Sequence, residues 1–141
     1  MSKVFGYPEY DEKGEKILTT YDNEYKAMMM DIRVYRMKAG ETRTFLREGE
    51  ETAVLLLSGN ITYKWNGNEA AATRKDVFTE GPWCVHGCTG TEIAVVANAE
   101  SQILVQCTFR CKALQTGRRS MGIFQRRKIR KRGKEKSKYD F

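Results

Sequence analysis

The chain has 141 residues, of which 40% are hydrophobic, and this is enough apolar material for the core of one domain but not of two. Its net charge of +7 is unevenly placed, because residues 1–109 carry 12 Lys and Arg against 16 Asp and Glu, whereas residues 110–141 carry 13 against 2. An acidic body has no broad basic face for phosphates, so any nucleic-acid binding is expected to be non-specific and confined to the basic tail.

Membrane insertion and secretion are both disfavoured by the apolar pattern. The longest apolar runs, such as residues 53–57, are far shorter than the roughly 20 residues that cross a bilayer. The polar segment after Met1 lacks the apolar stretch of a secretion signal. We therefore expect a cytoplasmic protein that has no membrane contact.

Short strands are predicted along most of the chain. Runs of β-branched and aromatic residues predict a strand that begins at Met30 and further strands at residues 52–57, 61–65, 69–73, 83–86, 92–97 and 101–107. Ser58-Gly59-Asn60 predicts a turn, and Asn66-Gly67 is typical of a tight type I′ hairpin turn. Because no long helical period competes, the pattern predicts an all-β antiparallel sandwich, with jelly rolls and cupins as the candidate folds.

The two ends of the chain differ from this body. Before Met30 the sequence predicts an irregular arm with one edge strand. We divide the chain into a β-sandwich domain at 1–109 and a basic tail at 110–141, which is too poor in apolar residues to order itself and is predicted to be disordered or weakly helical. Three interpretations of the tail stay open: a tether for nucleic acid or an acidic membrane, a solubilising extension, or an out-of-frame peptide.

A family resemblance is carried by segments 25–42, 50–59, 63–67, 76–78, 81–84 and 97–100. Over about residues 17–108 the chain resembles the N-terminal half of the 5-deoxy-glucuronate isomerases of bacterial myo-inositol catabolism, a cupin family shared with 5-keto-4-deoxyuronate isomerase. The resemblance implies aldose–ketose isomerisation of a deoxy sugar acid, and it places a divalent metal in a second cupin half that this sequence lacks. We therefore expect a truncated, isomerase-like protein that is inactive alone. The alternative is a non-catalytic module that binds a sugar acid or forms oligomers, and loss of a partner half predicts self-association.

The candidate site residues are few. Segment 45–51, where a cupin metal motif is expected, contains no histidine, so no metal or other cofactor is expected in this chain. Glu48 and His86 are the catalytic candidates, although an acidic turn and a packed histidine are the alternatives. The candidates for binding a substrate carboxylate are Arg33, Arg43 and Arg47, unless they lie on outer, solvated strand faces.

One further group has zinc-type ligands, namely Cys84, His86, Cys88, Cys107 and Cys111. In an extended strand the Cα atoms of Cys84 and Cys88 would lie about 13 Å apart, which is too far for one zinc ion. A turn at Gly87 would bring the two closer, but separate reduced thiols are the favoured interpretation.

Overall fold

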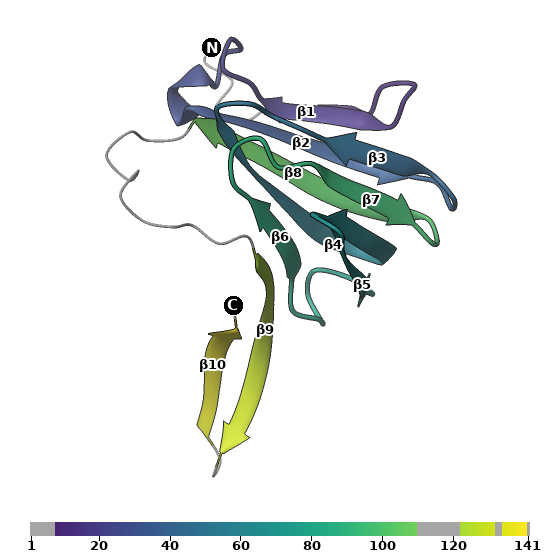
Figure 1. The fold of residues 1–141 in the computed structure, drawn as a ribbon, viewed down its shortest axis with the longest axis vertical. Coiled ribbons are helices and arrows are strands. Elements are labelled where there is room, and N and C mark those ends of the chain that lie inside the picture. Colours follow the sequence, from purple (N-terminus) through teal and green to yellow (C-terminus); the bar gives the residue numbers. More distant parts are fainter. Residues whose placement is uncertain (1–7, 110–121, 132–133, 141) are drawn as a thin grey trace.

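The computed structural model describes residues 8–109, 122–131 and 134–140 (Figure 1). These ranges form ten strands and one short 3₁₀ helix, and every strand pair is antiparallel. Within them, no helix is long and apolar enough to span a membrane. The elements are β1 (Glu15–Thr19), η1 (Lys26–Met28), β2 (Met30–Met37), β3 (Thr42–Phe45), β4 (Glu50–Trp65), β5 (Asn68–Arg74), β6 (Trp83–Gly87), β7 (Ile93–Ala97), β8 (Ser101–Phe109), β9 (Gly122–Lys131) and β10 (Lys134–Asp140).

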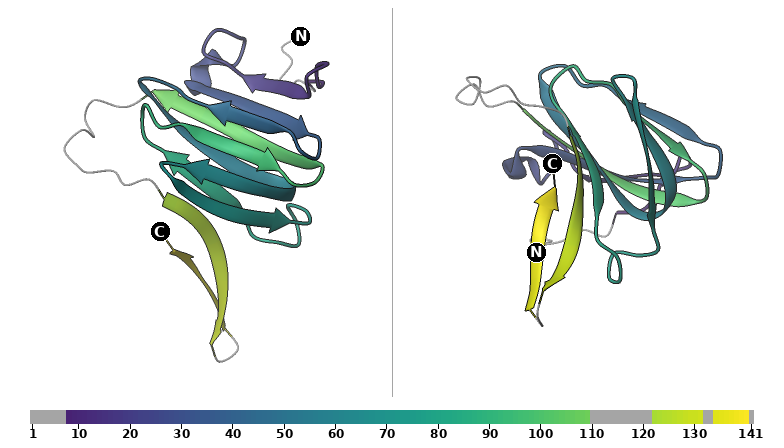
Figure 2. Two further views of the ribbon diagram at one scale, coloured as in Figure 1. Left: turned by 45° about the vertical axis from the view of Figure 1, so that its right-hand side comes forward. Right: turned by 60° about the horizontal axis from the view of Figure 1, so that its bottom comes forward.

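Two sheets pack face to face as a curled sandwich (Figure 2). The first sheet has the strand order β1-β2-β8-β4-β6-β9-β10. The second sheet has the order β3-β7-β4-β5. Strand β4 belongs to both, because its first half pairs with β8 and β6 and its second half pairs with β5 and β7. The all-β antiparallel sandwich predicted from the sequence is therefore confirmed.

The turn predicted at Ser58-Gly59-Asn60 is wrong, because β4 runs through these residues as one strand. The chain bends there as it passes from the first sheet to the second, with a register shift against β8 between Leu56 and Ser58. Gly59 has φ +113°, and a Cβ atom on it would lie 2.2 Å from Ser101 Oγ. A bend between sheets and a tight turn both require positive φ and close backbone approach, so the same residues are compatible with either.

The core lies between the two sheets, on the side of each strand that faces the other sheet. Tyr63 is fully buried there, and its hydroxyl donates to the carbonyl oxygens of Val54 and Trp83, each at 3.1 Å. A buried phenol therefore ties the two sheets together without leaving an unpaired polar atom. The other core members are Tyr35, Met37, Val54, Leu56, Ile61, Ala72, Val85, Ile93, Val95, Ala97, Ile103, Val105 and Cys107.

Two local predictions are confirmed. Asn66 (φ 44°) and Gly67 (φ 74°) both have positive φ between β4 and β5, as a type I′ turn requires. At the N-terminal side, β1 forms the edge of the first sheet after an irregular arm. The boundaries of most body strands also fall within a few residues of those expected.

The tail contains strands that the sequence did not predict. We expected disorder or weak helix after residue 109, but β9 and β10 form an antiparallel hairpin, and residues 122–125 of β9 pair with β6 (Figure 1). The composition of the tail predicts only how that segment behaves in isolation. The unpaired backbone groups of an edge strand such as β6 can form hydrogen bonds with a further strand of almost any sequence. The division of the chain at residue 109 itself stays a prediction.

Candidate functional site

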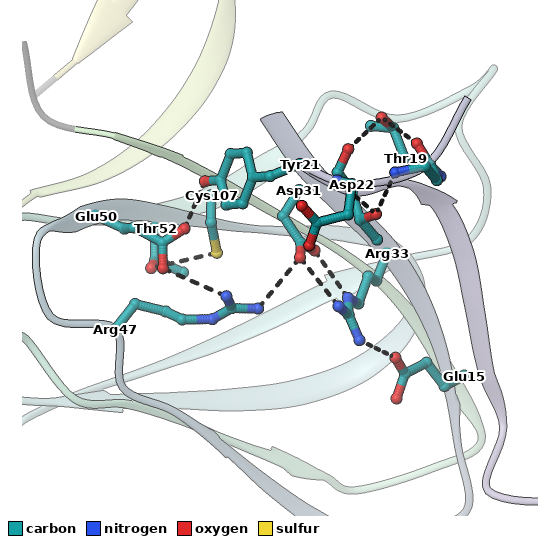
Figure 3. Close-up of polar contacts among 12 residues, drawn as sticks. Glu15, Thr19, Tyr21, Asp22, Asp31, Arg33, Arg47, Glu50, Thr52 and Cys107 are labelled. Atoms are coloured by element: carbon teal, nitrogen blue, oxygen red, sulfur yellow. Dashed lines mark hydrogen bonds and ion pairs between the residues drawn. The ribbon is translucent and has the colours of Figure 1, made fainter. Parts of the chain in front are cut away.

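A cluster of charged side chains lies on the core-facing side of the first sheet, near one end of the sandwich (Figure 3). Paired residues share a face, and β2 places Asp31 opposite Cys107 and Arg33 opposite Val105, both of which belong to the core. Glu50 is the first residue of β4, which is separated from β2 by β8, and it is also buried. The sheet thus brings two carboxylates and an arginine into a largely dry environment.

Arg33 is held tightly in this cluster. Its Nε and Nη2 donate to the two oxygens of Asp31 at 2.8 and 3.0 Å, and its Nη1 donates to Glu15 Oε1 at 2.5 Å. The hydrogen bonds to Asp31, followed by those to Glu15, raise the pKa of the Arg33 guanidinium despite its partial burial. All three contacts are short, so Arg33 is an anchor of the site with little capacity for another anion.

Arg47 is held much more loosely. It extends from the loop between β3 and β4, and it reaches Glu50 at 3.3 Å and Asp31 at 3.6 Å. Both distances exceed the 2.7–2.9 Å of a strong charge-assisted bond. Its side chain is 36% exposed, whereas that of Asp31 is 6% exposed. Arg47 is therefore the cationic group of the cluster that an incoming ligand reaches first.

Aromatic rings border the cluster on one side. The Tyr21 hydroxyl donates to Glu50 Oε1 at 2.5 Å, and the Tyr21 ring packs on Phe109 with centroids 4.4 Å apart. Burial, reinforced by the bond to Glu50, raises the pKa of Tyr21 well above its usual range, so the phenol keeps its proton. Phe109 remains 58% exposed and offers an apolar surface beside the charged groups.

Arg43 and Glu48 lie outside this cluster. Arg43 is on the core-facing side of β3, where it bonds Glu41 at 2.9 Å and the carbonyl oxygen of Lys13, with its guanidinium over the Tyr35 ring. Glu48 is exposed in the loop before β4, against Gly90. Of the three candidate arginines, the structure therefore brings together Arg33 and Arg47 only.

His86 lies on the opposite face of the first sheet. It pairs with Ala53, whereas its neighbour Val85 pairs with Val54 in the core. Its Nε2 is 3.2 Å from Glu51 Oε2. His86 and Glu48, the two catalytic candidates, are thus not assembled with the arginines into one site.

The cysteines do not converge either. Cys107 is buried on the core side, 3.6 Å from the Thr52 hydroxyl, whereas Cys84 lies on the outer face opposite Leu55. Burial raises the pKa of Cys84 to about 11 and also raises that of Cys107, which keeps both thiols protonated near neutral pH. Cys111 lies outside the described residues.

A divalent metal does not fit the part of the chain that the structure describes. No three side chains of His, Cys, Asp or Glu converge within these ranges in a way that could hold an ion. The carboxylates of the cluster are instead paired with Arg33, Arg47 and the phenol of Tyr21. Any metal chemistry of the family would have to use other residues.

Sequence reasoning missed Asp31, Glu50, Glu15 and Tyr21 as members of the cluster. One signal was available in the sequence. Asp31 and Arg33 occupy every second position of β2 together with Tyr35 and Met37, and all four therefore share its core-facing side. A charged pair on the otherwise apolar side of a strand indicates a binding or catalytic site. No comparable signal linked Tyr21 to Glu50, which lies 29 residues away.

Solved structures with similar folds identify the class. A cupin superfamily protein from Desulfitobacterium hafniense DCB-2 is 14% identical with a TM-score of 0.53, over 74% of this chain and 84% of that one. KdgF from Halomonas sp. is 13% identical with a TM-score of 0.53, over 77% and 91%. An IolB-like protein from Salmonella typhimurium LT2 is 16% identical with a TM-score of 0.62, over 84% of this chain but 47% of that one. The fold is therefore that of a cupin.

The family follows from the sequence. A model described as the KduI/IolB family matches residues 6–138, and the chain belongs to that family. This match extends beyond residue 109, further than the segments that carried the resemblance. No curated protein sequence matches the chain significantly. The chain spans about half the length of the IolB-like protein.

Proposed function

We propose that this chain is a sugar-acid-binding cupin domain of carbohydrate catabolism, equivalent to the first half of a 5-deoxy-glucuronate isomerase and without isomerase turnover of its own. The observation that carries the proposal is Arg47, a partly exposed guanidinium with two long contacts at the edge of a buried polar cluster. We place the protein in the bacterial cytoplasm, where such catabolism occurs.

The chemistry of the cluster suits a ligand that has one carboxylate and several hydroxyls. The planar guanidinium of Arg47 can donate two parallel hydrogen bonds to a carboxylate. Asp31 and Glu50 have further lone pairs that can accept hydrogen bonds from the hydroxyl groups of a ligand. Phe109 provides an exposed aromatic surface next to them, suited to the apolar face of a sugar ring.

Isomerisation needs more than binding. A proton must move between adjacent carbons, and an electrophile must stabilise the oxygens. In the described cluster each carboxylate is engaged by an arginine or a phenol, and no imidazole is present on that side of the sheet. By its resemblance, the family holds its metal in the second half. These features support ligand binding by this half without turnover.

Binding is tested by titrating the purified chain with D-glucuronate, with D-glucose as the matched neutral sugar, and following backbone amide shifts by NMR. We expect glucuronate alone to shift residues around Arg47, and Arg47→Gln to weaken the affinity at least about tenfold, the loss of one good charged contact. Arg43→Gln is the matched control, because Arg43 lies outside the cluster. The proposal would be overturned if both sugars bound equally. It would also be overturned if glucuronate did not bind at 20 mM, roughly the weakest affinity that such a titration can detect.

Turnover is tested separately. Purified protein incubated with a uronate and a divalent metal should give no ketose above a control without protein. Isomerisation that exceeds this control and is abolished by a chelator would refute the claim that this half is inactive alone.

A further inference from the structure

The hairpin of β9 and β10 extends away from the sandwich as a two-stranded ribbon (Figures 1 and 2). Residues 122–125 of β9 pair with β6, and the remainder of the hairpin leads away from that strand. We call this remainder, residues 126–131 and 134–139, the ribbon. It contains eight Lys and Arg residues and one Glu. A strongly basic segment is therefore held in a regular, extended conformation at one end of the molecule.

The strand register places most of these positive charges on one face of the ribbon. Residues that pair across two antiparallel strands share a face, and so do alternate residues along each strand. We call the more positive face the basic face, and its three pairs are Arg127 with Lys138, Ile129 with Lys136, and Lys131 with Lys134. The pairs of the opposite face are Arg126 with Tyr139, Lys128 with Ser137, and Arg130 with Glu135. The basic face thus has five cations and no carboxylate, whereas the opposite face has three cations and one carboxylate.

The two faces also differ in how their charges are compensated. On the opposite face, Arg130 stands across from Glu135, and unlike charges at directly opposed positions stabilise a sheet. On the basic face, the two pairs of charged residues, of which Lys131 with Lys134 is one, combine like charges, which are destabilising in opposed positions. The positive charge of the basic face therefore has no counterpart in the ribbon, and an external anion would stabilise the hairpin by neutralising it.

The shape of the basic face suits an anion that is long and regular. Alternate residues of a strand lie about 6.6 Å apart, neighbouring strands lie about 4.8 Å apart, and six residues extend about 20 Å. The basic face is therefore a narrow double row of positive charges. Double-stranded DNA has one negative charge per ~1.7 Å of helix axis on a stiff scaffold, and its major groove admits a two-stranded β-ribbon.

Other polyanions fit this ribbon less well. Proteins that bind single strands stack the bases on aromatic side chains, but Tyr139 is the only aromatic residue of the ribbon and belongs to its opposite face. Segments that insert into a membrane surface have an apolar face, whereas Ile129 and Tyr139 belong to different faces of the ribbon. We propose that the ribbon binds double-stranded DNA, with the basic face against the phosphates.

Such binding should be independent of the DNA sequence and strongly dependent on salt. Contacts to phosphates fix the position of a protein on DNA but carry no sequence information. Each neutralised phosphate releases counterions, so the logarithm of the binding constant falls with the logarithm of the salt concentration, with a slope of about −0.9 per contact and about −4.5 for five cations. The inference does not depend on the proposed sugar-acid site, which is formed by β2, β4 and the loop before β4.

The test is the fluorescence anisotropy of a labelled, mixed-sequence DNA duplex of about 20 base pairs, roughly two helical turns, titrated with the full chain. We expect a dissociation constant of about 1–100 μM near physiological salt, and a salt slope near −4.5 between about 50 and 200 mM. Vesicles that contain phosphatidylserine are the second probe, because anionic lipids also attract lysine and arginine.

Two variants, each with three cations of the ribbon replaced by glutamine, separate its faces. The basic-face variant combines Arg127→Gln, Lys136→Gln and Lys138→Gln. The opposite-face variant combines Arg126→Gln, Lys128→Gln and Arg130→Gln. The two variants have the same net charge, so only the placement of the charges differs between them. We expect the basic-face variant to bind DNA at least about tenfold more weakly, with a slope near −1.8, and the opposite-face variant to keep a slope of about −4.5.

A second basic-face variant, Lys131→Gln with Lys134→Gln, should give a slope of about −2.7. It keeps the test decisive if the triple change disturbs folding, which circular dichroism and the melting temperature check. Equal weakening by the variants of both faces would overturn the proposal, because it would show that the cations act without regard to the face they occupy. Absence of binding to the duplex at about 50 mM salt, or binding to the vesicles but not to the duplex, would also overturn it.

Discussion

Replacement of Gly59, at the bend in β4, by alanine should strongly destabilise the protein. The backbone at Gly59 has φ +113°, where an L side chain is strained by about 1–2 kcal/mol. The added Cβ would also lie 2.2 Å from Ser101 Oγ and 2.7 Å from Ser101 Cα. Because a backbone atom is among these contacts, rotation of the serine cannot relieve the overlap, which should cost a further 1–3 kcal/mol or so.

The surroundings of Ser101 make relaxation harder still. Its hydroxyl donates to the carbonyl of Ala99 at 2.8 Å and accepts from the amide of Asn60 at 3.1 Å. A shift of β8 away from β4 would break the bond from the Asn60 amide. We therefore expect Gly59→Ala to lower the free energy of unfolding by about 3 kcal/mol or more, measured by urea denaturation.

Gly67→Ala is the matched control. Gly67 also has positive φ, at +74°, but nothing lies within 4 Å of its added Cβ. Its expected cost is about 1 kcal/mol, the strain alone. If the two variants lose the same stability within about 0.5 kcal/mol, the steric reasoning about the bend in β4 is wrong.

Two further predictions concern protons. Because the pKa of Tyr21 is raised in the folded state by burial and by Glu50, its contribution to stability is present below the unfolded value near 10 and is lost as the pH rises above it. Tyr21→Phe should cost about 1–2 kcal/mol at pH 7 and reduce the loss of stability between pH 10 and 11 or so, measured by chemical denaturation. Cys84, with its pKa raised from 9.0 to about 11, should react with a disulfide reagent at pH 8 about 100-fold more slowly than in the unfolded chain, measured by mass spectrometry of the labelled peptide. Comparable rates would show that its burial is lost in solution.

Most strands of the body could be predicted because they have a local sequence pattern, although β3 was not among those expected. The hairpin of β4 and β5 follows from Asn66-Gly67 between alternating residues, and it is present as expected. The bend at Gly59 could not be distinguished from a turn, because the same positive φ serves both. Only the partner strand, β8, decides between them, and its first residue, Ser101, lies 42 residues after Gly59.

The candidate site was predicted only in part, because some of its features have a local sequence pattern and others depend on the arrangement of the strands. Arg33 and Arg47 were found by their residue type, which suits a carboxylate ligand. The association of Arg47 with Asp31 depends on β2, β8 and β4 lying in that order, which no local pattern specifies. The outer position of His86 could have been deduced from alternation with Val85, but only once the inner face of β6 was known.

Strand β4 has a consequence for how this protein unfolds. Its 16 residues supply a central strand to both sheets, and Tyr63 in its second half bonds to Val54 in its first half. Unfolding of either sheet breaks backbone hydrogen bonds of the other. The body therefore cannot be divided into two units that unfold independently. Hydrogen exchange should accordingly report a single cooperative unit across β2, β4, β7 and β8, with the edge strand β1 exchanging earlier.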